Sequence, residues 1–292
     1  MFLDSKFVFF GTPEFAAVIL QKLIGCGFIP TAVVCNPDRP VGRKKIIMPP
    51  PVKQIVKNGK LENKIEILQP ENPSSLVSHF LSLKPDFFIV AAYAQILPQK
   101  LIDVPRLGVI GAHPSLLPKY RGASPIQSAI LSGDEETGVT LYLLDDKMDH
   151  GPILARRELK NHESRIMNYE SLMRMLAKTG GELLVETLPK FLNKEIAPQT
   201  QNESKATYTK KFERKDAFVE PEDLLKAEAG TAPEKAIEIE RKIRAFNPEP
   251  GAWTILKGKQ VKLLESELVA GKLKLKQIQI EGEKPKMFHG EF

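Results

Sequence analysis

Apolar and polar positions follow one another along the first half of the chain in blocks that predict strands and helices in turn. Continuous apolar runs, the pattern of strands buried on both faces, occur at 7–10, 31–34, 86–92, 107–113 and 138–144. Helical spacing is predicted over 13–25 and again over 169–191. Such strands joined by helices predict a mostly parallel sheet covered on both faces, a Rossmann-like α/β fold.

The turn after the first strand reads GTPEF. Thr12 is expected to cap the following helix, with Pro13 in its first turn. The turn lacks the second and third glycines of the dinucleotide-binding fingerprint, so a nicotinamide or flavin site is disfavoured. An ordinary strand-to-helix turn is the simpler interpretation.

The pattern changes after residue 190. A polar stretch without sustained periodicity predicts a linker over 191–207, which separates domains expected at 1–190 and 208–292. The last part predicts a helix over 234–246 and then short alternating strands with glycine and lysine turns. These favour a smaller C-terminal β-barrel of the OB-like type, which often binds nucleic acid.

Composition narrows the class of protein without fixing it. The 42 lysines and arginines against 36 acidic residues give a net charge of +6, which permits a polyanionic partner without requiring one. The two cysteines, Cys26 and Cys35, are too few for a disulfide framework, and no metal-ligand set uses them. With no basic leader and no run long enough to span a bilayer, the expected location is the cytoplasm, with no membrane contact.

Two strand ends hold the candidate catalytic residues. His113 follows the apolar run LGVIGA, and ligands of parallel sheets bind at the carboxyl ends of the strands. The run GVTLYLL ends at Asp145, Asp146 and Asp149, which can orient a histidine and raise its proton affinity, or can simply cap loops and face water. No nucleophile elbow or phosphate-binding loop is present, which disfavours covalent catalysis and NTP hydrolysis.

A basic loop forms the third candidate feature. The segment CNPDRPVGRKKIIMPPPVK, residues 35–53, combines prolines with Arg39, Arg43, Lys44 and Lys45. A long loop at the mouth of a sheet is often functional, and such a charge cluster suits phosphate groups. A solvated charged loop explains the charge equally well.

Together these segments resemble the methionyl-tRNA formyltransferase family along nearly the whole chain. The matching blocks are GTPEFAA, NPDRPVGRKKIIMPPPVK, AAYAQILP, HPSLLPKYRGASPIQ, TGVTLYLLDDKMDHGPIL and RKIRAFNPEPGAW. The basic loop and the last block are specific to this family, whereas the others are shared with glycinamide ribonucleotide and nucleotide-sugar formyltransferases. The resemblance implies formyl transfer from 10-formyltetrahydrofolate to the α-amino group of methionyl initiator tRNA, without a metal.

The resemblance also implies roles for single residues. His113 would stabilise the negative oxygen of the tetrahedral intermediate and take part in proton transfer, and Asp149 would orient His113. The folate would lie against Gln95, Ile96, Leu97, Asp145, Asp146, Lys147 and Met148. The tRNA side would involve Arg43, Lys44, Lys45, Ser115, Leu116, Leu117, Pro118, Arg121 and Gly122. A monomer that binds tRNA but not DNA is expected.

One catalytic position departs from the family pattern. Gly111 stands where the family has an asparagine, so the side-chain amide that would hold the formyl oxygen is missing. Losing one such donor typically costs roughly 10²- to 10³-fold in rate. Gln95, His150 or a water molecule held at Gly111 are the candidate replacements. The other readings are an enzyme that formylates a small amine, such as an amino-sugar nucleotide, and a tRNA-binding homologue that has lost catalysis.

Overall fold

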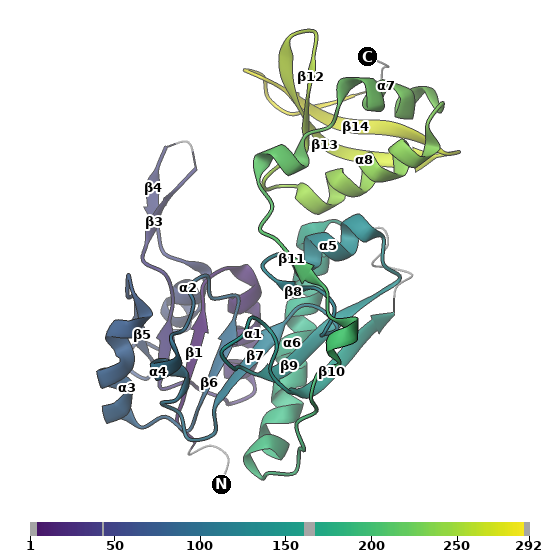
Figure 1. Cartoon of the computed structure of the whole chain (residues 1–292). Helices are drawn as coiled ribbons and strands as arrows, with labels where there is room; N and C mark the ends of the chain where they lie inside the picture. Colours follow the sequence, from purple (N-terminus) through teal and green to yellow (C-terminus); the bar gives the residue numbers. More distant parts are fainter. Residues whose placement is uncertain (1–4, 43, 161–166, 289–292) are drawn as a thin grey trace. The chain divides into compact units, whose positions relative to one another are not determined.

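The computed structural model describes residues 5–42, 44–160 and 167–288 in two compact units (Figure 1). The first unit comprises residues 1–121, 137–159 and 173–208, and the second comprises 122–136, 160–172 and 209–292. Residues 191–207, expected as a linker, therefore belong to the first unit. There Gln199 forms a bridge with Ile153 through two backbone hydrogen bonds.

A seven-stranded sheet forms the centre of the first unit, with strands ordered β10-β9-β7-β6-β1-β2-β5. The predicted mostly parallel α/β fold is confirmed, because β5, β2, β1, β6 and β7 run parallel to one another. The seven strands are β1 (Phe7–Gly11), β2 (Ala32–Val34), β5 (Glu66–Leu68), β6 (Phe87–Ala91), β7 (Val109–His113), β9 (Glu136–Leu143) and β10 (Ile153–Lys160).

Helices cover both faces of this sheet because the buried strands are apolar on both sides. Val8 and Phe10 of β1 pack on one face with Phe80 and Leu101. On the other face, Gly180 lies against Ile19 and Val139. The helices of this unit are α1 (Glu14–Gly25), α2 (Pro51–Asn58), η1 (Pro73–Leu76), α3 (Val77–Leu83), α4 (Gln99–Ile102), η3 (Glu203–Lys205) and most of α6 (Tyr169–Leu192).

Two details of the first unit differ from the expectations. Thr12 does not cap α1. Its hydroxyl accepts a hydrogen bond from the Asn36 backbone N–H, and Pro13 itself occupies the N-cap. In addition, β9 runs antiparallel to β7, with Gly111 opposite Tyr142 and His113 opposite Thr140. The carboxyl end of β9 therefore lies beside the start of β7, whereas His113 ends β7.

Where the sequence predicted a smaller C-terminal β-barrel of the OB-like type, the second unit contains a four-stranded antiparallel sheet of order β12-β13-β14-β15. Leu263 and Leu275 of this sheet pack with Leu224 of α7 and with Ile239 and Ile243 of α8. Its elements are α5 (Pro125–Ser132), η4 (Arg214–Ala217), α7 (Pro221–Ala229), α8 (Pro233–Phe246), β12 (Trp253–Leu256), β13 (Lys259–Val269), β14 (Lys272–Ile280) and β15 (Lys286–Met287).

The arginines of the block RKIRAFNPEPGAW hold the second unit together. Arg241 of α8 donates to the Ser132 carbonyl at the end of α5, and Arg244 donates to the Met167 carbonyl. Gly133, with φ of +67°, leaves room for the Arg241 guanidinium, since a Cβ there would lie 2.0 Å from it. These side chains stabilise the unit by donating hydrogen bonds to the backbone carbonyls of Ser132 and Met167.

Four further short strands form two pairs. The basic loop forms a hairpin of β3 (Arg39–Val41) and β4 (Ile46–Met48), which pair in antiparallel register (Figure 1). The stretch after His113 leads to β8 (Arg121–Gly122), which pairs with β11 (Tyr208–Thr209). The β3–β4 hairpin exposes Ile46, Ile47 and Met48.

Candidate active site

His113, the last residue of β7, is held in one orientation by its backbone surroundings. Its side chain is buried, and Nε2 lies 2.8 Å from the carbonyl oxygen of Tyr120. A carbonyl can only accept a hydrogen bond, so Nε2 carries the proton of the neutral imidazole. The lone pair of that imidazole is then on Nδ1, which lies 3.6 Å from Oδ2 of Asp149. His113 can therefore accept a proton at Nδ1 and hold it beside a carboxylate.

Asp149 reaches His113 by a route that the sequence did not predict. Because β9 is antiparallel to β7, residues 144–151 must turn back toward the end of β7. Gly151 allows this turn, since a Cβ there would lie 1.8 Å from the Leu143 carbonyl oxygen. Asp149 itself takes a left-handed backbone conformation, with φ of +50°. The expectation that these acids follow a strand parallel to β7 was wrong. The predicted contact between His113 and Asp149 is nevertheless present.

A buried polar network fixes the loop that carries Asp149. The Gln201 side-chain amide donates to the carbonyls of Asp149 and Gly151 at 2.9 and 2.8 Å. Its oxygen in turn accepts from Nε and Nη2 of Arg121 at 3.1 and 2.8 Å. Because this one amide group bonds the carbonyls on both sides of His150, it holds Asp149 against the strain of its left-handed conformation. Gln201 lies in the segment expected as a linker, and its role was missed because its partners are distant in sequence.

Arg121, expected to bind substrate, is fully buried, and its guanidinium is used within the protein. Besides Gln201 it bonds the Glu203 carboxylate at 2.6 and 3.0 Å and the Tyr208 hydroxyl at 3.0 Å. The Glu203 bond raises the pKa of Arg121, and the Arg121 bond lowers that of Glu203. The geometry favours a positioning role for Arg121 over contact with a phosphate.

The space beside Gly111 is filled from the neighbouring strand. A Cβ at Gly111 would lie 2.4 Å from Cε1 of Tyr142 and 2.8 Å from Cδ1 of Leu144. The Tyr142 hydroxyl donates to Oδ1 of Asp149 at 2.6 Å. Burial, with the nearby Asp149 charge, raises the pKa of Tyr142 well above its ordinary value, so the phenol is protonated at neutral pH. Tyr142 was not among the candidates, because a tyrosine within an apolar run indicates core packing.

The two side chains suggested as replacements at Gly111 are bonded elsewhere. Gln95 donates to Oδ1 of Asn36 and to the Pro70 carbonyl. His150 pairs with Asp145, at 2.6 Å from Nδ1 to Oδ2, and its Nε2 lies 3.5 Å from Glu203. Neither suggestion agrees with the observed contacts.

The segments expected to contact folate expose apolar side chains on loops of the first unit. Ile96 is 88% exposed and Met148 is 60% exposed, whereas Leu97 packs in the core. Asp145 accepts the backbone N–H of Lys147, which shapes the second loop. Asp146 and Lys147 are exposed. Exposed aliphatic groups of this kind suit a flat aromatic ring system.

The segments expected to contact the tRNA divide into buried and exposed residues. Ser115 and Leu117 are buried, and Thr140 ties both to β9 through hydrogen bonds with their backbone. Leu116, Pro118 and Gly122 are partly buried. Lys44 and Lys45 are exposed on the hairpin, and Arg43 lies outside the described residues. Only the hairpin lysines thus present a free cationic surface among the expected contacts that the structure describes.

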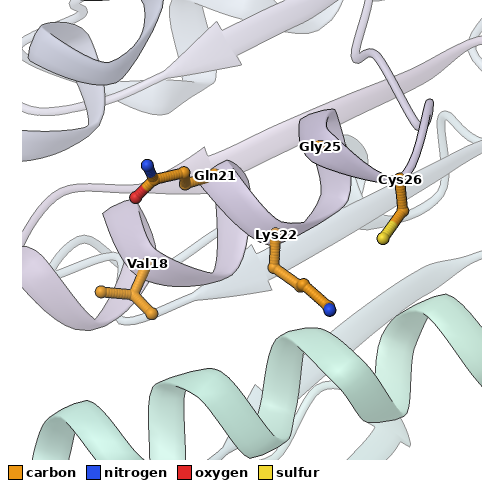
Figure 2. Close-up of a pocket in the computed structure, with 5 residues that line it drawn as sticks. All are labelled: Val18, Gln21, Lys22, Gly25 and Cys26. Atoms are coloured by element: carbon orange, nitrogen blue, oxygen red, sulfur yellow. The ribbon is translucent and has the colours of Figure 1, made fainter.

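Other features of the described chain do not compete with this site. A surface pocket of about 340 Å³ lies along α1 and is lined by Val18, Gln21, Lys22, Gly25 and Cys26 (Figure 2), none of which belongs to the site. Within the described residues, no group of three or more His, Cys, Asp or Glu side chains is arranged to hold a metal. Across the same residues, no helix is both long and apolar enough to cross a bilayer.

Comparison with known proteins agrees with the geometry. A family model described as formyl transferase matches residues 5–188, and one described as formyl transferase, C-terminal domain, matches 233–283. Methionyl-tRNA formyltransferase of Bacillus velezensis is 41% identical over 271 residues, which cover 92% of this chain and 80% of the relative. That of Bacillus subtilis is 38% identical over 268 residues, 91% of this chain and 79% of the relative.

Solved structures share the fold. HypX from Aquifex aeolicus, crystallised with tetrahydrofolic acid, has a TM-score of 0.64 at 17% identity, over 96% of this chain and 45% of that one. At this identity the likeness concerns the fold alone.

Proposed function

The chain belongs to the methionyl-tRNA formyltransferase family, and we propose that it transfers a formyl group from 10-formyltetrahydrofolate to the α-amino group of methionyl initiator tRNA. The observation that carries the proposal is the His113–Asp149 pair at the end of β7, with Nδ1 of His113 facing the carboxylate. It provides a proton acceptor of fixed orientation, which formyl transfer to an amine requires.

The reaction requires proton movement at two nitrogens. The amine attacks the formyl carbon, the bond from that carbon to N10 of the folate breaks, and the N10 leaving group takes up a proton while the amine loses one. Nδ1 of His113 is the site that accepts this proton, and Asp149 stabilises the imidazolium by its charge. The Nε2–H bond to the Tyr120 carbonyl makes Nδ1 the ring nitrogen that carries the lone pair in the neutral imidazole.

The two substrates are assigned to different surfaces of the first unit. The exposed side chains Ile96 and Met148 fit the face of the ring system of a reduced folate. The exposed lysines Lys44 and Lys45 fit phosphate groups of an acceptor stem, which such a hairpin contacts by charge. No metal is needed for either contact.

The proposal is tested by transfer of labelled formyl groups from 10-formyltetrahydrofolate to methionyl initiator tRNA. We expect transfer by the natural protein and a loss of about 10²- to 10⁴-fold in His113→Ala, the usual contribution of a positioned acid–base group. His79→Ala is the matched control, because His79 is half-exposed and pairs with Glu66 on the surface. Transfer to an amino-sugar nucleotide instead of the tRNA, or full activity in His113→Ala, would contradict the proposal.

A further inference from the structure

Gly111 and Tyr142 face each other across β7 and β9, which places their side-chain positions on the same face of the sheet. A side chain at Gly111 would place its Cβ 2.4 Å from Cε1 and 2.7 Å from Cζ of Tyr142, closer than any van der Waals contact allows. Glycine normally weakens a strand interior, and it is found where another group approaches closely. Here the nearest such group is the Tyr142 ring, followed by Cδ1 of Leu144, so the observed position of the ring requires a glycine at 111.

The Tyr142 hydroxyl ends at the carboxylate that serves His113. It donates to Oδ1 of Asp149 at 2.6 Å, and the other oxygen, Oδ2, faces Nδ1 of His113 at 3.6 Å. A hydrogen bond from a neutral phenol to a carboxylate is charge-assisted and directional. It restricts rotation of the carboxylate, which keeps Oδ2 aimed at the histidine.

On these observations we propose that Tyr142 is a positioning residue for Asp149, and that Gly111 is present in this chain to admit its ring. This inference rests on the proposed formyl transfer. The hydroxyl proton is committed to Asp149, so Tyr142 acts through the carboxylate and not as a donor to the formyl oxygen. The position where the family resemblance implies an asparagine is thus rebuilt around a residue from the adjacent strand.

The first test removes the hydroxyl alone. Tyr142→Phe keeps the ring beside Gly111 and is expected to lower kcat at least tenfold, while KM for both substrates stays within about threefold. A residue that only filled space would leave kcat unchanged, because phenylalanine fills the same space. Tyr169→Phe is the matched control: burial raises the pKa of Tyr169 as well, but it lies at the start of α6 and outside the site.

The second test asks whether the two positions depend on each other. Gly111→Asn alone is expected to lower kcat and the melting temperature, because the new Cβ collides with the Tyr142 ring. In a Tyr142→Leu background the same substitution is expected to raise kcat at least tenfold over Tyr142→Leu alone, because the ring is gone and the remaining close group, Cδ1 of Leu144, is the end of a side chain that can rotate away. This change of sign in a double-mutant cycle measures the coupling of the two positions directly.

The outcomes separate the inference from the proposed function. Wild-type kcat in Tyr142→Phe, or an equal effect of Gly111→Asn in both backgrounds, would overturn the inference while formyl transfer stands. Absence of formyl transfer by the natural protein would overturn both. If Gly111→Asn unfolds the protein, the kcat of Tyr142→Phe compared with that of the wild type still decides whether Tyr142 positions Asp149.

Discussion

Arg121→Lys separates two roles for a residue that the sequence assigned to the substrate and the structure places in the interior. Lysine keeps the charge but replaces the planar fork with a single ammonium group. The Arg121 guanidinium makes bonds to Gln201, Glu203 and Tyr208 from three different nitrogens. An ammonium group cannot reach all of these acceptors at once.

The expected loss of stability in Arg121→Lys follows from the hydrogen-bond partners that Gln201 would lose. Gln201 is 5% exposed, and its side-chain oxygen accepts two bonds from Arg121. A buried polar group left without a partner costs about 1–3 kcal/mol, and the shorter side chain leaves a void in addition. We therefore expect Arg121→Lys to lower the free energy of unfolding by about 2–4 kcal/mol, and the melting temperature by about 4–16 °C.

Thermal unfolding and steady-state kinetics provide the assay. Arg106→Lys is the matched control, because Arg106 is 69% exposed and pairs with Asp86, an arrangement worth at most about 1 kcal/mol. At a temperature where the variant stays folded, kcat is expected to fall, since Gln201 no longer holds the Asp149 carbonyl firmly. Unchanged stability together with a raised KM for tRNA would refute the reasoning and restore Arg121 to the substrate surface.

Three further outcomes are expected. The double substitution Lys44→Gln, Lys45→Gln should weaken tRNA binding and lower the magnitude of the slope of log affinity against log salt by about 1–2. The free energy of unfolding should not change. A salt slope equal to that of the wild type would exclude phosphate contact by the hairpin. A thiol reagent at pH 8 should label Cys26 rapidly and spare Cys35 in the native protein, because burial raises the pKa of the Cys35 thiol to about 12; rapid labelling of both thiols would contradict this. The free energy of unfolding should fall as pH rises above about 10, because the Tyr142 phenol ionises in the unfolded chain but stays protonated in the folded one. Denaturant titrations at several pH values measure this dependence. In Tyr142→Phe the slope of the free energy of unfolding against pH should be shallower by up to about 1.4 kcal/mol per pH unit.

The order of elements in the first unit could be predicted because strands buried on both faces have a recognisable sequence pattern, a continuous apolar run. Runs such as FVFF and LGVIGA have no polar side chain at any position, which only a strand covered on both faces requires. His113 could be placed at a strand end for the same reason. Its selection as a catalytic residue needed the family resemblance as well, since a lone histidine at a strand end has several possible roles.

The direction of β9 could not be predicted. The run GVTLYLL is equally apolar whether the strand lies parallel or antiparallel to β7, so its pattern carries no information on direction. The antiparallel pairing sets Tyr142 opposite Gly111, and this register explains the glycine. The glycine at position 111 therefore showed where the chain departs from the family pattern, but the sequence did not show that Tyr142 is its neighbour.

Local preferences failed where a distant group offered a better bond. Thr12 is a good N-cap residue by preference, yet its hydroxyl accepts from the Asn36 N–H at the end of β2. Arg121 beside Lys119 reads as surface charge, yet its acceptors lie about 80 residues further on. In both cases a tertiary contact outweighs a preference worth about 1 kcal/mol.

Strained backbone marks where these tertiary contacts matter most. Tyr120 and Asp149 both adopt left-handed conformations, at φ of +62° and +50°, which cost of order 1 kcal/mol or more each for residues other than glycine. Each is held by the segment 199–208: Thr207 accepts the Tyr120 N–H, and Gln201 donates to the Asp149 carbonyl. Tyr120 orients Nε2 of His113, and Asp149 faces Nδ1. Because both ring nitrogens face groups whose conformations residues 199–208 maintain, we expect changes in that segment to alter catalysis through His113 and Asp149, although its composition resembles a linker.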